Sequence, residues 1–202
     1  MGSPALHEER HFTYRDYLSW PDEERCELID GVVYAMSPAP LLNHQSLVGE
    51  LYHQLRGQLE GKPCRAFIAP VDVRLPKEGQ DDDHTDTVVQ PDVFVVCDPK
   101  KLDARGVRGG PDFVIEVLSS KTAARDHLEK RRVYERAGVR EYWLVHPTDH
   151  LATIYRRDGA GFVGPEILPF AGETSVDVLP GIVIRWEPIV ASLDELAAAA
   201  GE

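Results

Sequence analysis

Two short runs of the chain are almost wholly apolar, and each is associated with one carboxylate. Glu116 interrupts the run from residue 113 to 118, and Asp92 directly precedes the run from 93 to 96. Short apolar runs that are rich in β-branched residues are typical of strands buried on both faces, so we expect both in a mostly parallel sheet. A lone ionised carboxylate there is costly to desolvate and must be protonated, paired or bound to a metal. Two such strands side by side are the arrangement that a divalent cation needs.

The rest of the pattern alternates between helical and extended periods. In chain order it predicts a helix, a strand with a turn at Asp30-Gly31, a helix, three strands, a helix and a strand, over residues 13–20, 27–36, 47–59, 65–75, 93–97, 113–118, 126–137 and 142–145. A C-terminal part follows, with strands near 151–156 and 182–186 and a short helix within 193–200. We therefore predict an α/β fold with a central mixed sheet flanked by helices and a C-terminal antiparallel β extension. We expect one domain over 1–202, with its core at about 13–147 and the extension at about 148–190.

The net charge of −12 argues against a nucleic-acid partner, but the charge is unevenly distributed. Residues 121–140 carry a local charge of +4, which leaves −16 for the remaining chain. A basic patch of this kind can bind a phosphodiester backbone with weak, salt-dependent affinity. A solvated helix face, balanced by acidic residues elsewhere, explains the same count equally well.

The three cysteines are scattered and odd in number, which favours reduced thiols in a cytoplasmic protein over a disulfide framework. No segment approaches the roughly 18 apolar residues of a membrane span. We therefore expect a cytoplasmic location and no membrane partner.

The helix predicted after Glu116 directs a charged residue inward. Its apolar stripe lies within residues 133–137, and steps of three and four residues towards the N-terminus reach Lys130 and then Asp126. Asp126 is explained by a helix N-cap. Lys130 either extends to the edge of the sheet or stabilises the charge of a phosphoryl transfer. We favour the second role because its ammonium lies one helix away from two carboxylates.

Several segments together resemble a known family of nucleases. The order Gln90-Pro91-Asp92 and then Glu116-Val117-Leu118 is similar to the PD-(D/E)XK nuclease signature. Other residues make the resemblance more specific, because they are similar to the Uma-two family of restriction endonucleases. They are segments 27–31, 112–119 and 138–143, and Asp126 with Lys130 and Tyr134. The resemblance runs from about Tyr14 to Pro188. It implies a restriction-endonuclease-like α/β core, magnesium-dependent phosphodiester hydrolysis and a poorly defined substrate.

The resemblance also implies roles for single residues. Asp92, Glu116 and the backbone carbonyl of Val117 would hold Mg²⁺, for which Mn²⁺ can substitute. The signature places its lysine at position 118, where this chain has leucine, and the lysine that the Uma-two pattern takes from the next helix matches Lys130.

Two further positions leave alternatives open. Lys121 is the competitor for the catalytic lysine. Glu27 matches the family's early glutamate and would hold a metal-bound water or a second ion, although a surface carboxylate at a strand end explains it nearly as well.

Four residues are candidates for substrate contacts, namely Arg131, Arg132, Lys121 and His44. The expected partner is DNA, and a homodimer is left open. A second hypothesis is a module of nuclease fold that binds DNA or protein without turnover, which the acidic net charge favours. A third is hydrolysis of a small phosphate ester or nucleotide at the same metal site.

Overall fold

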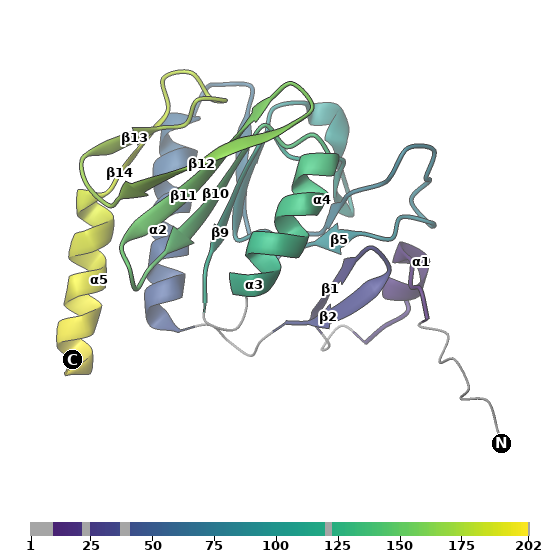
Figure 1. The fold of residues 1–202 in the computed structure, drawn as a ribbon, viewed down its shortest axis with the longest axis horizontal. Helices are drawn as coiled ribbons and strands as arrows, with labels where there is room; N and C mark the ends of the chain where they lie inside the picture. Colours follow the sequence, from purple (N-terminus) through teal and green to yellow (C-terminus); the bar gives the residue numbers. More distant parts are fainter. Residues whose placement is uncertain (1–9, 22–24, 37–40, 120–122, 202) are drawn as a thin grey trace.

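A six-stranded mixed sheet forms the centre of the molecule (Figure 1). The computed structural model describes residues 10–21, 25–36, 41–119 and 123–201. The strands of this central sheet are β3 (Arg65–Ile68), β6 (Val93–Val96), β9 (Phe113–Val117), β10 (Glu141–His146), β11 (Leu151–Asp158) and β12 (Gly161–Pro169). Their order across the sheet is β12-β11-β10-β9-β6-β3. The two strands that follow or contain the predicted carboxylates, β6 and β9, are therefore neighbours.

A second six-stranded sheet lies beside the first, in the order β2-β1-β5-β4-β8-β7. Its strands are β1 (Cys26–Ile29), β2 (Val32–Ala35), β4 (Val73–Arg74), β5 (Val88–Val89), β7 (Leu102–Asp103) and β8 (Gly106–Arg108). A separate antiparallel pair consists of β13 (Glu173–Ser175) and β14 (Val183–Arg185). This pair and the β11–β12 hairpin form the predicted C-terminal antiparallel extension.

Helices cover both faces of the central sheet (Figure 1). The helical segments are α1 (Tyr14–Tyr17), α2 (Leu42–Gln58), a 3-10 turn (Pro99–Lys101), α3 (Ala123–Arg125), a π-helical turn (Asp126–Lys130), α4 (Arg131–Arg136) and α5 (Glu187–Ala200). Helices α2 and α5 pack over one apolar core. On the opposite face, α4 and the second sheet enclose the other core. The central strands are thus buried from both sides, which explains their nearly continuous apolar sequences.

Most strand pairs of the central sheet are antiparallel, so the expectation of a mostly parallel sheet is wrong. Among its described strands, only β9 and β10 pair in parallel. An apolar run reports burial on both faces, and here that burial comes from the layers on either side. It does not report the direction of the neighbouring strand.

Two other expectations needed correction at element boundaries. The predicted strand 65–75 is divided into β3 and β4, because Pro70 lacks the N–H that a continuous ladder requires. The helix expected from 126 begins at Ala123 and passes through the π-helical turn before α4. The turn at Asp30-Gly31 is confirmed. Both residues have positive φ, 48° and 79°, as a two-residue hairpin loop requires.

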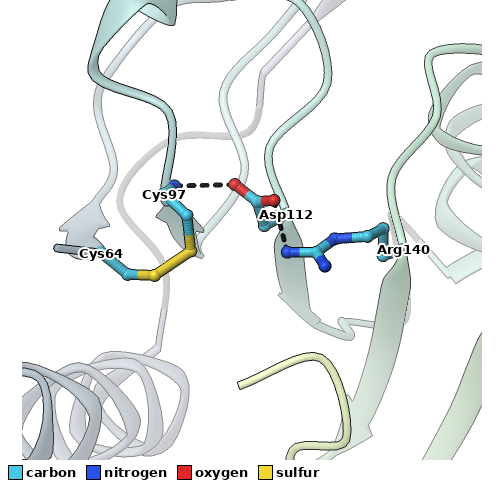
Figure 2. Close-up of a disulfide and its surroundings, with 4 residues drawn as sticks. All are labelled: Cys64, Cys97, Asp112 and Arg140. Carbon is cyan, nitrogen blue, oxygen red and sulfur yellow. Dashed lines mark hydrogen bonds and ion pairs between the residues drawn. A yellow bond between two sulfur atoms is a disulfide. The ribbon is translucent and has the colours of Figure 1, made fainter. Parts of the chain in front are cut away.

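A disulfide joins Cys64 to Cys97 and contradicts the expectation of three reduced thiols (Figure 2). Arg65 pairs with Val96 in the β3–β6 ladder, so the next residues outward are the two cysteines. The backbone N–H of Cys97 donates to the Asp112 carboxylate at 2.7 Å. Sequence spacing could not reveal this pairing because it depends on the register of two strands. The cytoplasmic location, which rested partly on reduced thiols, stays a prediction.

None of the helices within the described ranges is long and apolar enough to cross a membrane.

Candidate active site

Asp92 and Glu116 lie on the same face of the central sheet. Val93 pairs with Ile115 in the antiparallel β6–β9 ladder, and the register continued by one residue places Asp92 opposite Glu116. Asp92 Oδ2 also accepts a hydrogen bond of 2.8 Å from the Val117 backbone N–H. Adjacent strands therefore bring the two carboxylates to the same end of the sheet. A shared cation requires this placement, and carboxylates on opposite faces would have excluded it.

Lys130 lies among carboxylates from three different elements. Its Nζ is 2.8 Å from Glu27 Oε1, 3.0 Å from Glu116 Oε1 and 3.6 Å from Asp126 Oδ1. The lysine is only 5 % exposed. The apolar stripe of the helix thus predicted its inward position, while its catalytic role stays a prediction.

Glu27 is part of this cluster and is not a surface carboxylate. It is 1 % exposed on β1 of the second sheet. Besides Lys130, its Oε1 accepts a 2.9 Å hydrogen bond from the Gln90 backbone N–H. The structural alternative for Glu27 is therefore wrong, although its proposed role toward a metal-bound water stays untested.

Two buried tyrosines support the cluster, although the sequence interpretation gave neither of them a role in the site. The Tyr134 hydroxyl donates to Glu116 Oε1 at 2.7 Å, and the Tyr142 hydroxyl donates to the Asp126 carbonyl oxygen at 3.0 Å. Tyr134 follows Lys130 by four residues on the same stripe, so helical spacing could have indicated it. Tyr142 belongs to β10 and gave no such signal.

The π-helical turn helps to align this stripe. In an α-helix, residues four apart are rotated by about 40°, so a row of such residues drifts around the axis. The wider π turn between Asp126 and Lys130 lowers the angle per residue and reduces this drift. Asp126, Lys130 and Tyr134 consequently all face the carboxylates of the two sheets.

The cluster contains more negative than positive charge. Asp92, Glu116, Glu27 and Asp126 carry four charges when ionised, whereas Lys130 and Arg125, which lies 3.7 Å from Glu27, carry two. Burial raises the pKa of Asp92 to about 7, although Lys130 opposes the shift.

The other two central groups are perturbed as well. Burial, and the charges of Asp126, Asp92 and Glu27, hold the pKa of Glu116 well above its usual range despite Lys130. Burial opposes the charged form of Lys130, but Glu116, Glu27 and Asp126 outweigh it and raise the pKa of the ammonium well above its usual value. The lysine is therefore charged, and the carboxylates compete for too little positive charge.

With all four carboxylates ionised, the excess of two negative charges matches the charge of a divalent cation. Within the described ranges, no three His, Cys, Asp or Glu side chains form a group that could hold a metal by themselves. Magnesium needs fewer, because it keeps several waters and is bound through one or two carboxylates. Asp92 and Glu116 satisfy that requirement, and the backbone carbonyl of Val117 is the third expected ligand.

Comparison with known proteins places the chain in a family. Residues 14–187 match the sequence profile of the Uma2 (Uma-two) family, described as "Putative restriction endonuclease". The chain belongs to the Uma2 family. It is 28 % identical over 149 residues to the uncharacterized protein slr1290 of Synechocystis sp., covering 72 % of this chain and 74 % of the relative.

A crystal structure shares the fold. It is that of a protein from Anabaena variabilis described as a putative nuclease belonging to DUF820, with a TM-score of 0.70 at 19 % identity. The match covers 90 % of this chain and 99 % of the other. The restriction-endonuclease-like fold predicted for this Uma2 protein is thereby confirmed.

His44 lies beside Asp92, at the edge of the charged cluster. It comes from the first turn of α2, and its Nε2 is 3.5 Å from Asp92 Oδ2. Its Nδ1 is buried without a hydrogen-bond partner among the described residues. Burial lowers the pKa of the imidazole, which favours the neutral form. The structure therefore brings His44 to the site, as a substrate contact requires.

The other expected substrate contacts are less well placed. Arg132 is paired with Asp30 at 2.7 Å and with Glu129 at 3.0 Å. Arg131 lies over the Tyr155 ring on β11, with its guanidinium carbon 5.6 Å from the ring centre. Lys121 lies outside the described residues, so its competition with Lys130 stays open.

Proposed function

We propose that the protein is a metal-dependent endonuclease that hydrolyses phosphodiester bonds of DNA. The observation that carries this proposal is the placement of Asp92 and Glu116 opposite one another on neighbouring strands, with the Lys130 ammonium 3.0 Å from Glu116. Membership of a family described as restriction endonucleases supports the same reaction class.

Asp92, Glu116 and the Val117 carbonyl would hold Mg²⁺ or Mn²⁺. The bound ion would polarise the phosphate and lower the pKa of a coordinated water. The Tyr134 hydroxyl fixes one oxygen of Glu116, and Glu27 fixes the lysine ammonium. Lys130 then places a permanent positive charge where negative charge develops on the phosphate oxygens.

Cleavage assays on duplex, single-stranded and branched DNA test this proposal. Asp92→Asn and Glu116→Gln should each reduce metal-dependent turnover by about 100-fold or more, since even residues that support metal ligands contribute 10–100-fold. Exposed Asp158→Asn and Glu195→Gln remove the same charges far from the cluster and are the matched controls. Equal turnover in all four variants and the parent would refute the proposal.

Lys130→Met separates catalysis from binding. Under single-turnover conditions at saturating metal, this variant should lose turnover strongly while DNA affinity changes little. Lys100→Met, an exposed substitution, is its control. Because Lys130 is the central counter-charge for buried carboxylates, thermal unfolding must first establish that the variant is folded. Unchanged turnover in folded Lys130→Met would transfer the role to Lys121 or end the lysine mechanism.

A binding module without turnover is the alternative. Its support is that Lys130 contacts three carboxylates, which is also what a purely structural ion cluster requires, and that the net charge is −12. A parent protein that binds DNA but cleaves none of the substrates with Mg²⁺ or Mn²⁺ would establish this alternative.

A further inference from the structure

Arg125 lies at the partly exposed edge of the charged cluster. Neither its sequence position nor the Uma2 resemblance assigned it a role. It is the last residue of α3, directly before the turn that carries Asp126 and Lys130. Its guanidinium carbon lies 4.6 Å from the centre of the Tyr34 ring on β2. One guanidinium nitrogen lies 3.7 Å from Glu27 Oε2. Its side chain is 20 % exposed, so it is held by the protein and still reaches solvent.

The hydrogen-bonding capacity of Arg125 is not used within the described part of the chain. The 3.7 Å contact with Glu27 is an ion pair that is too long for a hydrogen bond. No other described residue accepts a hydrogen bond from this guanidinium, which has five N–H donors. Arg74, in contrast, donates to Asp82 and Asp103 and has the role of a buried structural arginine.

An arginine of this kind suits a phosphate group. Its planar guanidinium can donate two parallel hydrogen bonds to phosphate oxygens, and stacking on an aromatic ring fixes the plane. Through Glu27, Arg125 is one carboxylate away from Lys130. Arg132 lacks this freedom because two carboxylates hold it.

We propose that Arg125, positioned over the Tyr34 ring, binds the non-bridging oxygens of a substrate phosphate at this site. The inference rests on the proposed function for the reaction that follows binding. The binding of a phosphate by Arg125 does not depend on that reaction. The phosphate can belong to a polynucleotide or to a small phosphate ester, because both offer the same oxygens. Arg125 is thus a substrate-binding residue that lies on the cluster side of the helix.

Equilibrium binding in EDTA tests the inference without turnover. The probes are a fluorescein-labelled DNA duplex, the matching single strand, a nucleoside monophosphate and inorganic phosphate. Arg125→Gln should weaken binding by about ten-fold, the loss expected for a charge-assisted contact. The slope of log affinity against log salt should fall by about 0.9 for the duplex, as expected for one lost phosphate contact.

Further variants separate charge from geometry. Arg125→Lys keeps the charge and loses the planar fork, so it should bind more weakly than the parent and more tightly than Arg125→Gln. Tyr34→Leu removes the stacking surface and should also weaken binding, whereas Tyr34→Phe should bind like the parent. Arg185→Gln, an exposed arginine that is already ion-paired with Glu173 at 2.9 Å, is the control and should change affinity by less than about two-fold. Thermal unfolding confirms that each variant is folded.

The outcomes distinguish the inference from the proposed function. Loss of affinity for DNA alone identifies a polynucleotide, and an equal loss for the nucleotide or inorganic phosphate identifies a small phosphate ester. Folded Arg125→Gln that binds all probes like the parent overturns the inference even if the parent cleaves DNA. Arg125-dependent binding by a parent that never cleaves overturns the proposed function and leaves the inference standing. A parent that binds no probe overturns the inference.

Discussion

At the scale of single residues, the excess negative charge of the site makes stability depend on pH. The pKa of Asp92 is raised to about 7 in the folded protein, so the folded chain binds its proton more tightly than the unfolded chain does. The unfolding free energy of the metal-free protein should therefore fall as pH rises from about 4 to about 7.

Asp92→Asn should remove part of this decline and be more stable than the parent near pH 7 in EDTA. Urea unfolding at several pH values measures the effect, and Asp158→Asn is the matched control. Saturating Mg²⁺ should reverse the order of stability, because the ion binds the carboxylate of the parent and not the amide. Identical pH profiles for Asp92→Asn and the parent in EDTA would contradict the prediction.

Some residues of the site could be predicted from the sequence, and others could not. Glu116 and Asp92 were recognised because carboxylates are exceptional in apolar strands, and Lys130 because a charge on an apolar stripe is exceptional too. Arg125 was missed because its environment comes from Tyr34 and Glu27, almost a hundred residues earlier in the chain. Helical spacing reports which way a side chain points, and it does not report which distant segment it meets.

At the scale of elements, an ion network fixes the second sheet against the helix that carries Lys130. Asp30, in the turn between β1 and β2, is 2.7 Å from Arg132 and 2.8 Å from Arg136. Lys77 joins the network at 3.0 Å from Asp30 and 2.6 Å from Asp86. Since β1 carries Glu27, this network helps to hold Glu27 close to Lys130. The network also pairs Arg132 and Arg136 with a carboxylate, and both belong to the basic segment 121–140 that was considered for binding DNA.

A close approach of backbones fixes the other end of the same helix. A Cβ at Gly110 would lie 2.4 Å from the Ala137 carbonyl oxygen, at the C-terminal end of α4. Gly110→Ala should therefore lower the unfolding free energy by about 1–3 kcal/mol, as overpacking does. Urea unfolding measures the change.

The matched control for this prediction is Gly57→Ala in α2. Nothing lies within 4 Å of a Cβ at Gly57, and alanine is the better helix former by up to about 1 kcal/mol. This control should be neutral or stabilised. An unchanged stability of Gly110→Ala would mean that the helix end can move away from residue 110 without cost.

Element types were easier to predict than their pairing. The stripe of α2, the hairpin turn at Asp30-Gly31 and the C-terminal antiparallel strands all follow from periods and turn residues. The π-helical turn and the antiparallel β6–β9 pair do not, because periods and turn residues show neither a local change in helix type nor the path of the whole chain.

At the scale of the whole molecule, the Cys64–Cys97 bond closes a large covalent loop. The two residues are 33 positions apart, and crosslinks of this kind restrict the unfolded chain and typically stabilise by about 2–4 kcal/mol. The double variant Cys64→Ser with Cys97→Ser should lose stability by this amount in urea unfolding. A dithiol reductant should destabilise the parent similarly and leave the double variant unchanged. A reductant effect on the double variant would assign the change to another cause.

Homodimer formation and the single-domain organisation over 1–202 stay predictions.

The position of that bond also bears on local motion within the site. Strand β3 is an edge strand, and its ladder with β6 runs from the disulfide to the Ala69 N–H, which donates to the Asp92 carbonyl oxygen at 3.0 Å. Edge strands open more readily than strands inside a sheet. One end of this ladder is held covalently, so fraying begins at the other, and amide hydrogen exchange should be faster at Ala69 than at Phe67. Asp92 thus lies at the end of this ladder that the disulfide does not hold, where the backbone can adjust more readily to an arriving ligand.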